Sequence, residues 1–84
     1  MKEKDILNEL ERLAAQLSVT IKYVKLNAKG GLCRVYGKYF IYVDTKITLN
    51  AKISILTNSL KNFNISDIYL SPALRLFLKE YEAS

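Results

Sequence analysis

The sequence predicts an α+β domain with the element order α-β-β-β-α-(β)-α, in which the bracketed strand is short. Three observations predict it. Apolar residues recur at helical spacing in three segments, β-branched and aromatic residues fill the stretch between the first two, and a glycine turn divides that stretch. The 84 residues are half apolar, which suits one domain spanning residues 1–84 with a single core. We expect its strands to form an antiparallel sheet in chain order.

The first helix is predicted from Asp5 to Leu17, because apolar residues recur there every three or four positions. Ser18 breaks this pattern. The first strand is predicted from Val19 to Leu26, where Val19, Ile21 and Tyr23 alternate with more polar residues.

A hairpin is predicted next, with strands Gly31–Tyr36 and Tyr39–Thr45. Gly37-Lys38 is the expected two-residue loop, a type II′ turn with glycine in the position that needs a positive φ. This loop pairs Tyr36 with Tyr39 and Val35 with Phe40. Neither face of the hairpin is then cleanly polar, so we expect both to be covered. One face carries Leu32, Arg34, Tyr36, Tyr39, Ile41 and Val43, and the other carries Cys33, Val35, Phe40 and Tyr42.

The second helix is predicted from Leu49 to Lys61, with Thr48 as its N-cap. Residues 68–70 suggest a short edge strand. Ser71-Pro72 is typical of a helix start, so the last helix is predicted from Pro72 to Glu82. We expect the first two helices to pack on one sheet face, around Leu10, Leu13, Leu17, Ile21, Ile41, Ile53, Leu56 and Leu60.

The composition leaves little material for catalysis or metal binding. There is no histidine and one cysteine, Cys33, so the chain cannot form an internal disulfide and has almost no ligands for zinc. Cys33 lacks a histidine to activate it and is expected to be a small buried residue. We therefore expect no catalytic residues, no cofactor and no enzymatic activity. No segment resembles a signal peptide or a membrane span, which predicts a cytoplasmic protein without membrane contact.

Positive charge is concentrated in the middle of the chain. Residues 19–62 carry a formal +7 and each flank carries −1, which together give the net charge of +5. Tyrosines interleave with these cations, and aromatic rings beside cations are typical of surfaces that bind single-stranded nucleic acid. Tyrosine and arginine are equally typical of protein interfaces. A small interaction or regulatory module is our first expectation and nucleic-acid binding is the alternative, through Lys22, Lys25, Lys29, Arg34 and Lys38.

We expect a chain of this size to cover only one of two apolar surfaces well. One is the second hairpin face and the other is the apolar side of the last helix. A symmetric homodimer would cover them, unless the last helix folds back over that face within one chain. The predicted interface residues are Val35, Phe40, Tyr42, Leu74, Phe77 and Tyr81.

Two segments resemble known proteins. Gly30-Gly31-Leu32-Cys33-Arg34 and Asp67-Ile68-Tyr69-Leu70-Ser71-Pro72-Ala73-Leu74-Arg75 are similar to segments of small uncharacterised bacterial proteins. This resemblance implies a bacterial protein and no particular activity. The element order also resembles the double-stranded-RNA-binding domain, but Thr48–Lys52 lacks that family's glycine-rich loop and lysine cluster. Some zinc peptidases place H-E-x-x-H on a helix after a strand pair, and the helix predicted over 49–61 has neither histidine nor glutamate.

Overall fold

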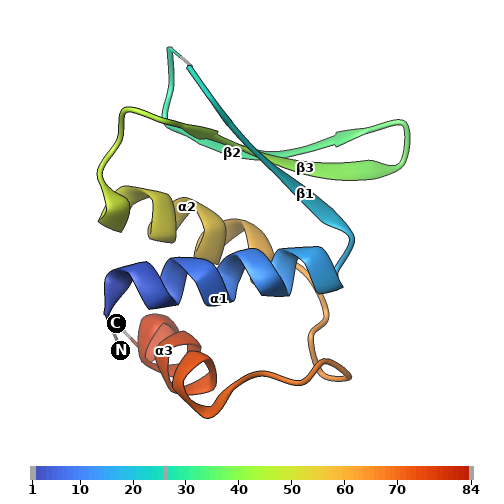
Figure 1. Cartoon of the computed structure of the whole chain (residues 1–84). Coiled ribbons are helices and arrows are strands. Elements are labelled where there is room, and N and C mark those ends of the chain that lie inside the picture. Colours follow the sequence, from blue (N-terminus) through green and yellow to red (C-terminus); the bar gives the residue numbers. More distant parts are fainter. Residues whose placement is uncertain (1, 26, 84) are drawn as a thin grey trace.

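The computed structural model describes residues 2–25 and 27–83, without the side chains of residues 82 and 83. Along the chain the elements are α1 (Glu3–Gln16), β1 (Val19–Val24), β2 (Gly30–Val35), β3 (Lys38–Asp44), α2 (Leu49–Leu60) and α3 (Pro72–Ala83). Figure 1 shows their arrangement. The predicted α+β class is confirmed, and the predicted element ends agree within two residues. The expected end of the first strand, Leu26, lies outside the described residues.

The order of the strands differs from the prediction. The sheet has the order β1-β3-β2, so β3 is central and β1 and β2 are not paired with each other. β1 runs parallel to β3, with Ile21 beside Ile41, while β2 pairs antiparallel with β3. The expected antiparallel sheet in chain order was therefore wrong. A central strand is paired on both edges, which suits β3, the most continuously apolar of the three.

The hairpin turn lies one residue earlier than predicted. Tyr36 and Gly37 form the loop with φ values of 50° and 79°, which makes it a type I′ turn instead of type II′. Val35 pairs with Lys38 and Arg34 with Tyr39, so the predicted pairing of Tyr36 with Tyr39 was wrong. Each strand moved by one position, which leaves the paired side chains on the faces that the sequence predicted, except that Tyr36 is now in the turn.

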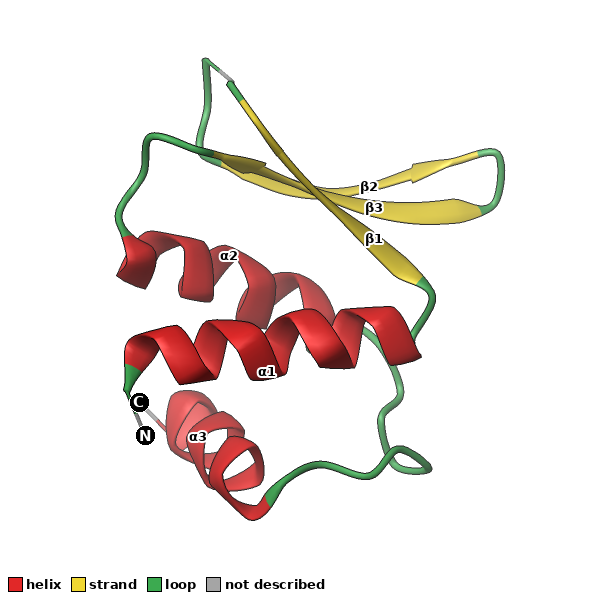
Figure 2. Cartoon of the chain, viewed as in Figure 1, coloured by secondary structure: helices red, strands yellow, loops and turns green. Residues whose placement is uncertain are grey.

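All helices that the structure describes lie on one side of the sheet (Figure 2). α1 and α2 pack directly on it, as predicted, and α3 packs on α1. The core between them is formed by side chains that are at most 4% exposed: Leu10, Leu13, Ala14, Val19, Ile41, Val43, Ile53, Leu56, Leu60 and Leu74. Leu17 and Ile21 pack against this core and are partly buried, so the predicted core is confirmed.

Local signals set the helix ends. Ser18 has a φ of 60°, the left-handed conformation that commonly ends a helix, and it directs the chain from α1 into β1. Thr48 Oγ1 accepts a hydrogen bond from the Ala51 N–H at 3.1 Å, and Ser71 Oγ accepts one from the Leu74 N–H at 3.2 Å. The predicted N-cap at Thr48 and the predicted helix start at Ser71-Pro72 are confirmed.

The strand predicted over residues 68–70 is absent from the described chain. Residues 66–67 form a turn, and the Ile68 N–H donates to the Ile65 carbonyl at 3.1 Å. The segment carries Leu70 into the space beside the core and delivers Ser71 to its capping position. It therefore positions α3 and does not extend the sheet.

Candidate functional site

The sheet has one face without a helix on it. Side chains of alternate residues point to this side, and we call the surface they form the outer face. By the register its residues are Thr20, Lys22, Val24, Gly31, Cys33, Val35, Lys38, Phe40, Tyr42 and, at the end of β3, the buried Asp44. The opposite, inner face packs on α1 and α2. The predicted second hairpin face is thus part of the outer face, and Figure 2 shows that α3 lies on the far side of the helical layer.

Two aromatic rings occupy the centre of the outer face. Phe40 and Tyr42 both belong to the central strand, and their ring centroids are 6.2 Å apart with the planes tilted by 30°. Both side chains are half-buried, yet neither packs against the core. They are therefore supported by their neighbours in the sheet and remain partly exposed.

Lysines flank these rings. The parallel register sets Lys22 beside Tyr42, and the Lys22 Nζ lies 5.8 Å from the centroid of the Phe40 ring. Lys38 lies opposite Val35 at the hairpin end. In the three strands the only acid is Asp44, which is 7% exposed and accepts a hydrogen bond from the Lys46 N–H at 2.9 Å. The outer face consequently combines exposed aromatic surface with positive charge.

The five predicted basic residues are not one cluster. Lys22 and Lys38 lie on the outer face, and Lys25 and Lys29 flank the connection at one end of the sheet. Arg34 points to the inner side, where its guanidinium carbon is 5.5 Å from the centroid of the Tyr39 ring. The prediction assumed that β1 and β2 are neighbours, and β3 separates them.

Three of the four tyrosines in the basic part of the chain do not lie on the outer face. Tyr23 Oη donates a hydrogen bond to Glu11 Oε2 at 2.5 Å, and burial together with that carboxylate holds the pKa of Tyr23 well above its usual range. Tyr39 packs edge-on against Phe63 with ring centroids 5.0 Å apart. Tyr36 is fully exposed in the hairpin turn. Of the four tyrosines in this region, Tyr42 is the one on the outer face, and Phe40 supplies the second ring.

The predicted interface residues divide between two locations. Val35, Phe40 and Tyr42 lie on the outer face, whereas Leu74 is 2% exposed and belongs to the core. Phe77 and Tyr81 are half-buried, with ring centroids 5.9 Å apart. The last helix thus buries part of its apolar side within the chain against α1, and Leu74 offers no surface to a partner. Folding of this helix over the second sheet face, the alternative to the dimer, was also wrong.

Cys33 is exposed, which corrects the expectation of a buried residue. Cys33 lies on the outer face, which no helix of the described chain covers, and β2 is an edge strand with a neighbour on one side.

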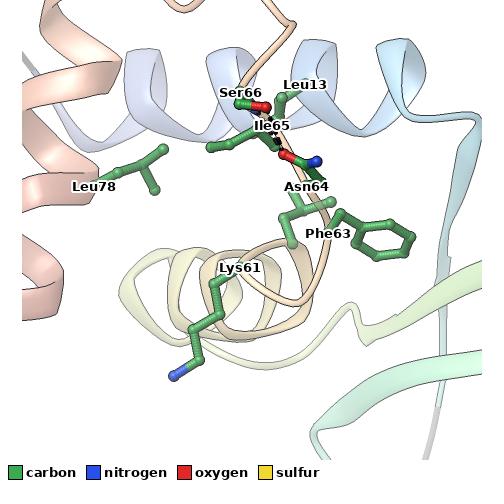
Figure 3. A pocket seen from close by; sticks show the side chains of 8 residues that line it. Leu13, Lys61, Phe63, Asn64, Ile65, Ser66 and Leu78 are labelled. Carbon is green, nitrogen blue, oxygen red and sulfur yellow. Dashed lines mark hydrogen bonds between the residues drawn. The ribbon is translucent and has the colours of Figure 1, made fainter.

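A separate cavity of about 380 Å³ lies between α1, α2, α3 and residues 61–66 (Figure 3). Its walls are mainly the apolar side chains of Leu13, Leu60, Phe63, Ile65 and Leu78. Asn64 Oδ1 accepts hydrogen bonds from the N–H and the hydroxyl of Ser66, and the Lys61 side chain extends away from Ile65 and Leu78. With these polar groups bonded to each other or directed outward, the cavity is a gap in apolar packing.

No group of three or more metal-ligating side chains occurs in the part of the chain that the structure describes. Over the same residues, no helix is both long and apolar enough to cross a lipid bilayer. Comparisons with protein-family models, with curated proteins and with solved structures found no match for this chain.

Proposed function

We propose that the protein binds single-stranded nucleic acid through the outer face. One observation carries this proposal: Phe40 and Tyr42 stand together on the central strand, on the sheet face that no described helix covers, with the Lys22 Nζ over the Phe40 ring and Lys22 opposite Tyr42 in the register. Bases stack on aromatic side chains, and lysines beside them meet the phosphates.

A single strand suits this surface better than a duplex. Stacking on Phe40 or Tyr42 requires a base whose flat side is free, and in a duplex both sides are covered by neighbouring pairs. The outer face has no projecting helix that could enter a groove. The net charge of +5 favours any polyanion, so the aromatic pair, and not charge alone, would give the preference for single strands.

The test is fluorescence polarisation with labelled oligo(dT), oligo(U) and a duplex, each at two salt concentrations. Replacing either Phe40 or Tyr42 with Ala should weaken single-strand binding about 5- to 150-fold, since stacking contributes about 1–3 kcal/mol per base. The control is Tyr69→Ala, an aromatic residue that is 75% exposed far along the chain from the sheet. It should change nothing.

Charge is tested separately. Lys22→Glu with Lys38→Glu should weaken binding and flatten its salt dependence, because each phosphate contact to a single strand contributes about 0.7 to the slope. Lys4→Glu with Lys79→Glu changes the net charge equally, away from the sheet, and should have a smaller effect. Absence of binding at low salt, or equal losses in the test and control variants, would exclude nucleic-acid binding by this face.

We infer that binding is the protein's activity and that it is not an enzyme. The sequence has no histidine, and its one thiol projects from an edge strand beside Phe40. Cys33→Ser should therefore leave oligonucleotide binding unchanged. Cleavage of the labelled oligonucleotide by pure protein with Mg²⁺ present, lost in a folded single-residue variant, would refute this inference.

A protein-interaction module is the second candidate, and one observation favours it. A groove of about 420 Å³ beside α3 holds two exposed apolar side chains, Tyr69 at 75% and Leu76 at 56%, next to Arg75 and Lys79. This combination suits an acidic segment with apolar side chains. A synthetic peptide of alternating glutamates and leucines should bind. The same peptide with glutamine in place of each glutamate should not. Equal behaviour of the two peptides would remove this candidate.

A further inference from the structure

We infer that two copies of the chain pair through their β2 strands, antiparallel, and so join two three-stranded sheets into one of six strands. The inference rests on the proposed function, because the joined sheet would present two outer faces as one continuous surface. Its structural basis is that β2 ends the sheet order β1-β3-β2 and pairs with β3 alone.

The free edge of β2 has little of the usual protection. Edge strands normally carry lysine, proline or inward-pointing charges that prevent pairing with another strand. β2 reads Gly-Gly-Leu-Cys-Arg-Val, without lysine or proline, and its one inward-pointing charge, Arg34, is held against the Tyr39 ring. Leu32 and Val35 are 36% and 39% exposed. An unpaired edge with exposed apolar residues favours addition of another strand.

The opposite edge is better protected. β1 carries Lys22 at its centre and is followed by Lys25. The Tyr23 side chain is held on the inner side by its hydrogen bond to Glu11. A new strand is therefore expected at β2.

A second copy is the occupant that fits this edge most simply. An antiparallel strand paired with itself obeys a two-fold axis, so each copy satisfies the other's free N–H and C=O groups with the same residues. If the helices of both copies lie on the same side of the joined sheet, the two-fold axis is perpendicular to the sheet. The axis must then pass between the two copies of one and the same residue, which can be Leu32, Cys33 or Arg34.

Local geometry selects Cys33. An axis at Arg34 would oppose two guanidinium groups, and like charges directly opposite each other are destabilising. An axis at Leu32 would require Gly30, whose φ of 130° departs from regular strand geometry. An axis at Cys33 uses residues 31–35 and opposes the two Cys33 side chains on the outer face, beside Phe40 of each copy.

Joining the two sheets would lengthen the proposed nucleic-acid-binding surface, because the two outer faces would be continuous. Strands lie about 4.8 Å apart, so three strands span about 14 Å and six about 29 Å. Each copy carries +5, so the copies repel until phosphates or salt screen them. Binding of a long single strand and pairing of the copies should therefore strengthen each other, by the same factor.

The first experiment measures mass by analytical ultracentrifugation at tens of micromolar protein. The wild type and Cys33→Thr should sediment as dimers. Cys33→Lys should sediment as a monomer, because it opposes two like charges at an exposed position that the fold tolerates. A wild type that remains monomeric at every concentration and salt would overturn the inference, as would a Cys33→Lys variant that dimerises equally well.

The second experiment locates the two-fold axis by disulfide trapping with the oxidant diamide. Diamide takes two electrons and two protons from a pair of neighbouring thiols, which form a disulfide while diamide is reduced. Wild type should be trapped as a covalent dimer. The control is Val35→Cys in a Cys33→Ser background, similarly exposed, where the two thiols would be about 13 Å apart along the strands. Equal trapping of the two proteins would mean random collision and would refute the proposed axis.

These results are separable from the proposed function. A monomeric wild type that still binds oligo(dT) through Phe40 and Tyr42 refutes the pairing alone. A dimer that binds no oligonucleotide refutes nucleic-acid binding and leaves the joined sheet without the role given to it here. Affinity that rises sharply once the oligonucleotide spans both copies, in wild type but not in Cys33→Lys, supports both.

Discussion

Alanine at each of the three glycines should have three different effects on stability. At Gly30 a methyl group would fall on the carbonyl oxygen of Tyr42 and 3.1 Å from the Val43 Cα, both backbone atoms of β3, and φ there is 130°. At Gly37 φ is 79°, but no atom lies within 4 Å of the added carbon. Gly31 has open space as well and no positive φ.

The magnitudes follow from these differences. Gly37→Ala should lose about 1–2 kcal/mol of unfolding free energy, the cost of a left-handed L-residue. Gly30→Ala adds about 1–3 kcal/mol of backbone strain to about 1–3 kcal/mol of overpacking, since β3 cannot move without disturbing the core. Gly31→Ala should gain about 0.5–1 kcal/mol, because glycine inside a strand costs conformational entropy.

Urea denaturation followed by circular dichroism measures the unfolding free energy of all three variants. The comparison is valid if the slope of the unfolding free energy against urea concentration is the same in each. A chain of 84 residues has a total stability of about 4–13 kcal/mol, so Gly30→Ala should lose a large share of it. If Gly30→Ala and Gly37→Ala lose equal free energy, the close approach of Gly30 to β3 is wrong. A destabilised Gly31→Ala would contradict its open position at the sheet edge.

Three further predictions concern single side chains. Thr48→Ala should lower the unfolding free energy by about 1 kcal/mol because it removes the hydrogen bond to the Ala51 N–H, whereas Thr48→Ser should restore it; denaturation of the three proteins checks this. Thr57→Val should stabilise the protein by about 1 kcal/mol, since Thr57 Oγ1 is buried without a hydrogen-bond partner among the described residues, and an unchanged or lower urea midpoint would contradict this. The raised pKa of Tyr23 means that the folded state favours the protonated phenol, so this contribution is complete below about pH 10 and is lost as pH rises above it. Tyr23→Phe should therefore lose less stability than the wild type between pH 9 and pH 11, and parallel pH profiles would refute this assignment.

Much of the fold could be predicted because its signals are local. The spacing of Leu10, Leu13, Leu56 and Leu60 determined which sides of α1 and α2 face the sheet. Thr48 and Ser71 marked helix starts through hydrogen bonds that span three residues. The hairpin at Gly37 was also visible, since positive φ is a property of the residue itself, although Tyr36 shares the turn.

The predicted faces of the paired hairpin residues were correct although the predicted hairpin register was wrong. Moving the turn from Gly37-Lys38 to Tyr36-Gly37 shifts each strand by one residue, and the two shifts together preserve which residues share a face. Phe40 and Tyr42 could therefore be placed together from the sequence. That this face has no cover could not.

The sequence alone thus determined the elements, their buried sides and the grouping of Phe40 with Tyr42, because each depends on neighbours a few residues away. Only the tertiary structure decided that β3 lies between β1 and β2, that Cys33 is exposed, that Leu74 is buried against α1 and that the outer face is open. These features result from competition among distant segments for the same edges and faces. The most apolar strand took the position with the greatest burial, and α3 packed on α1 instead of covering the other face of the sheet.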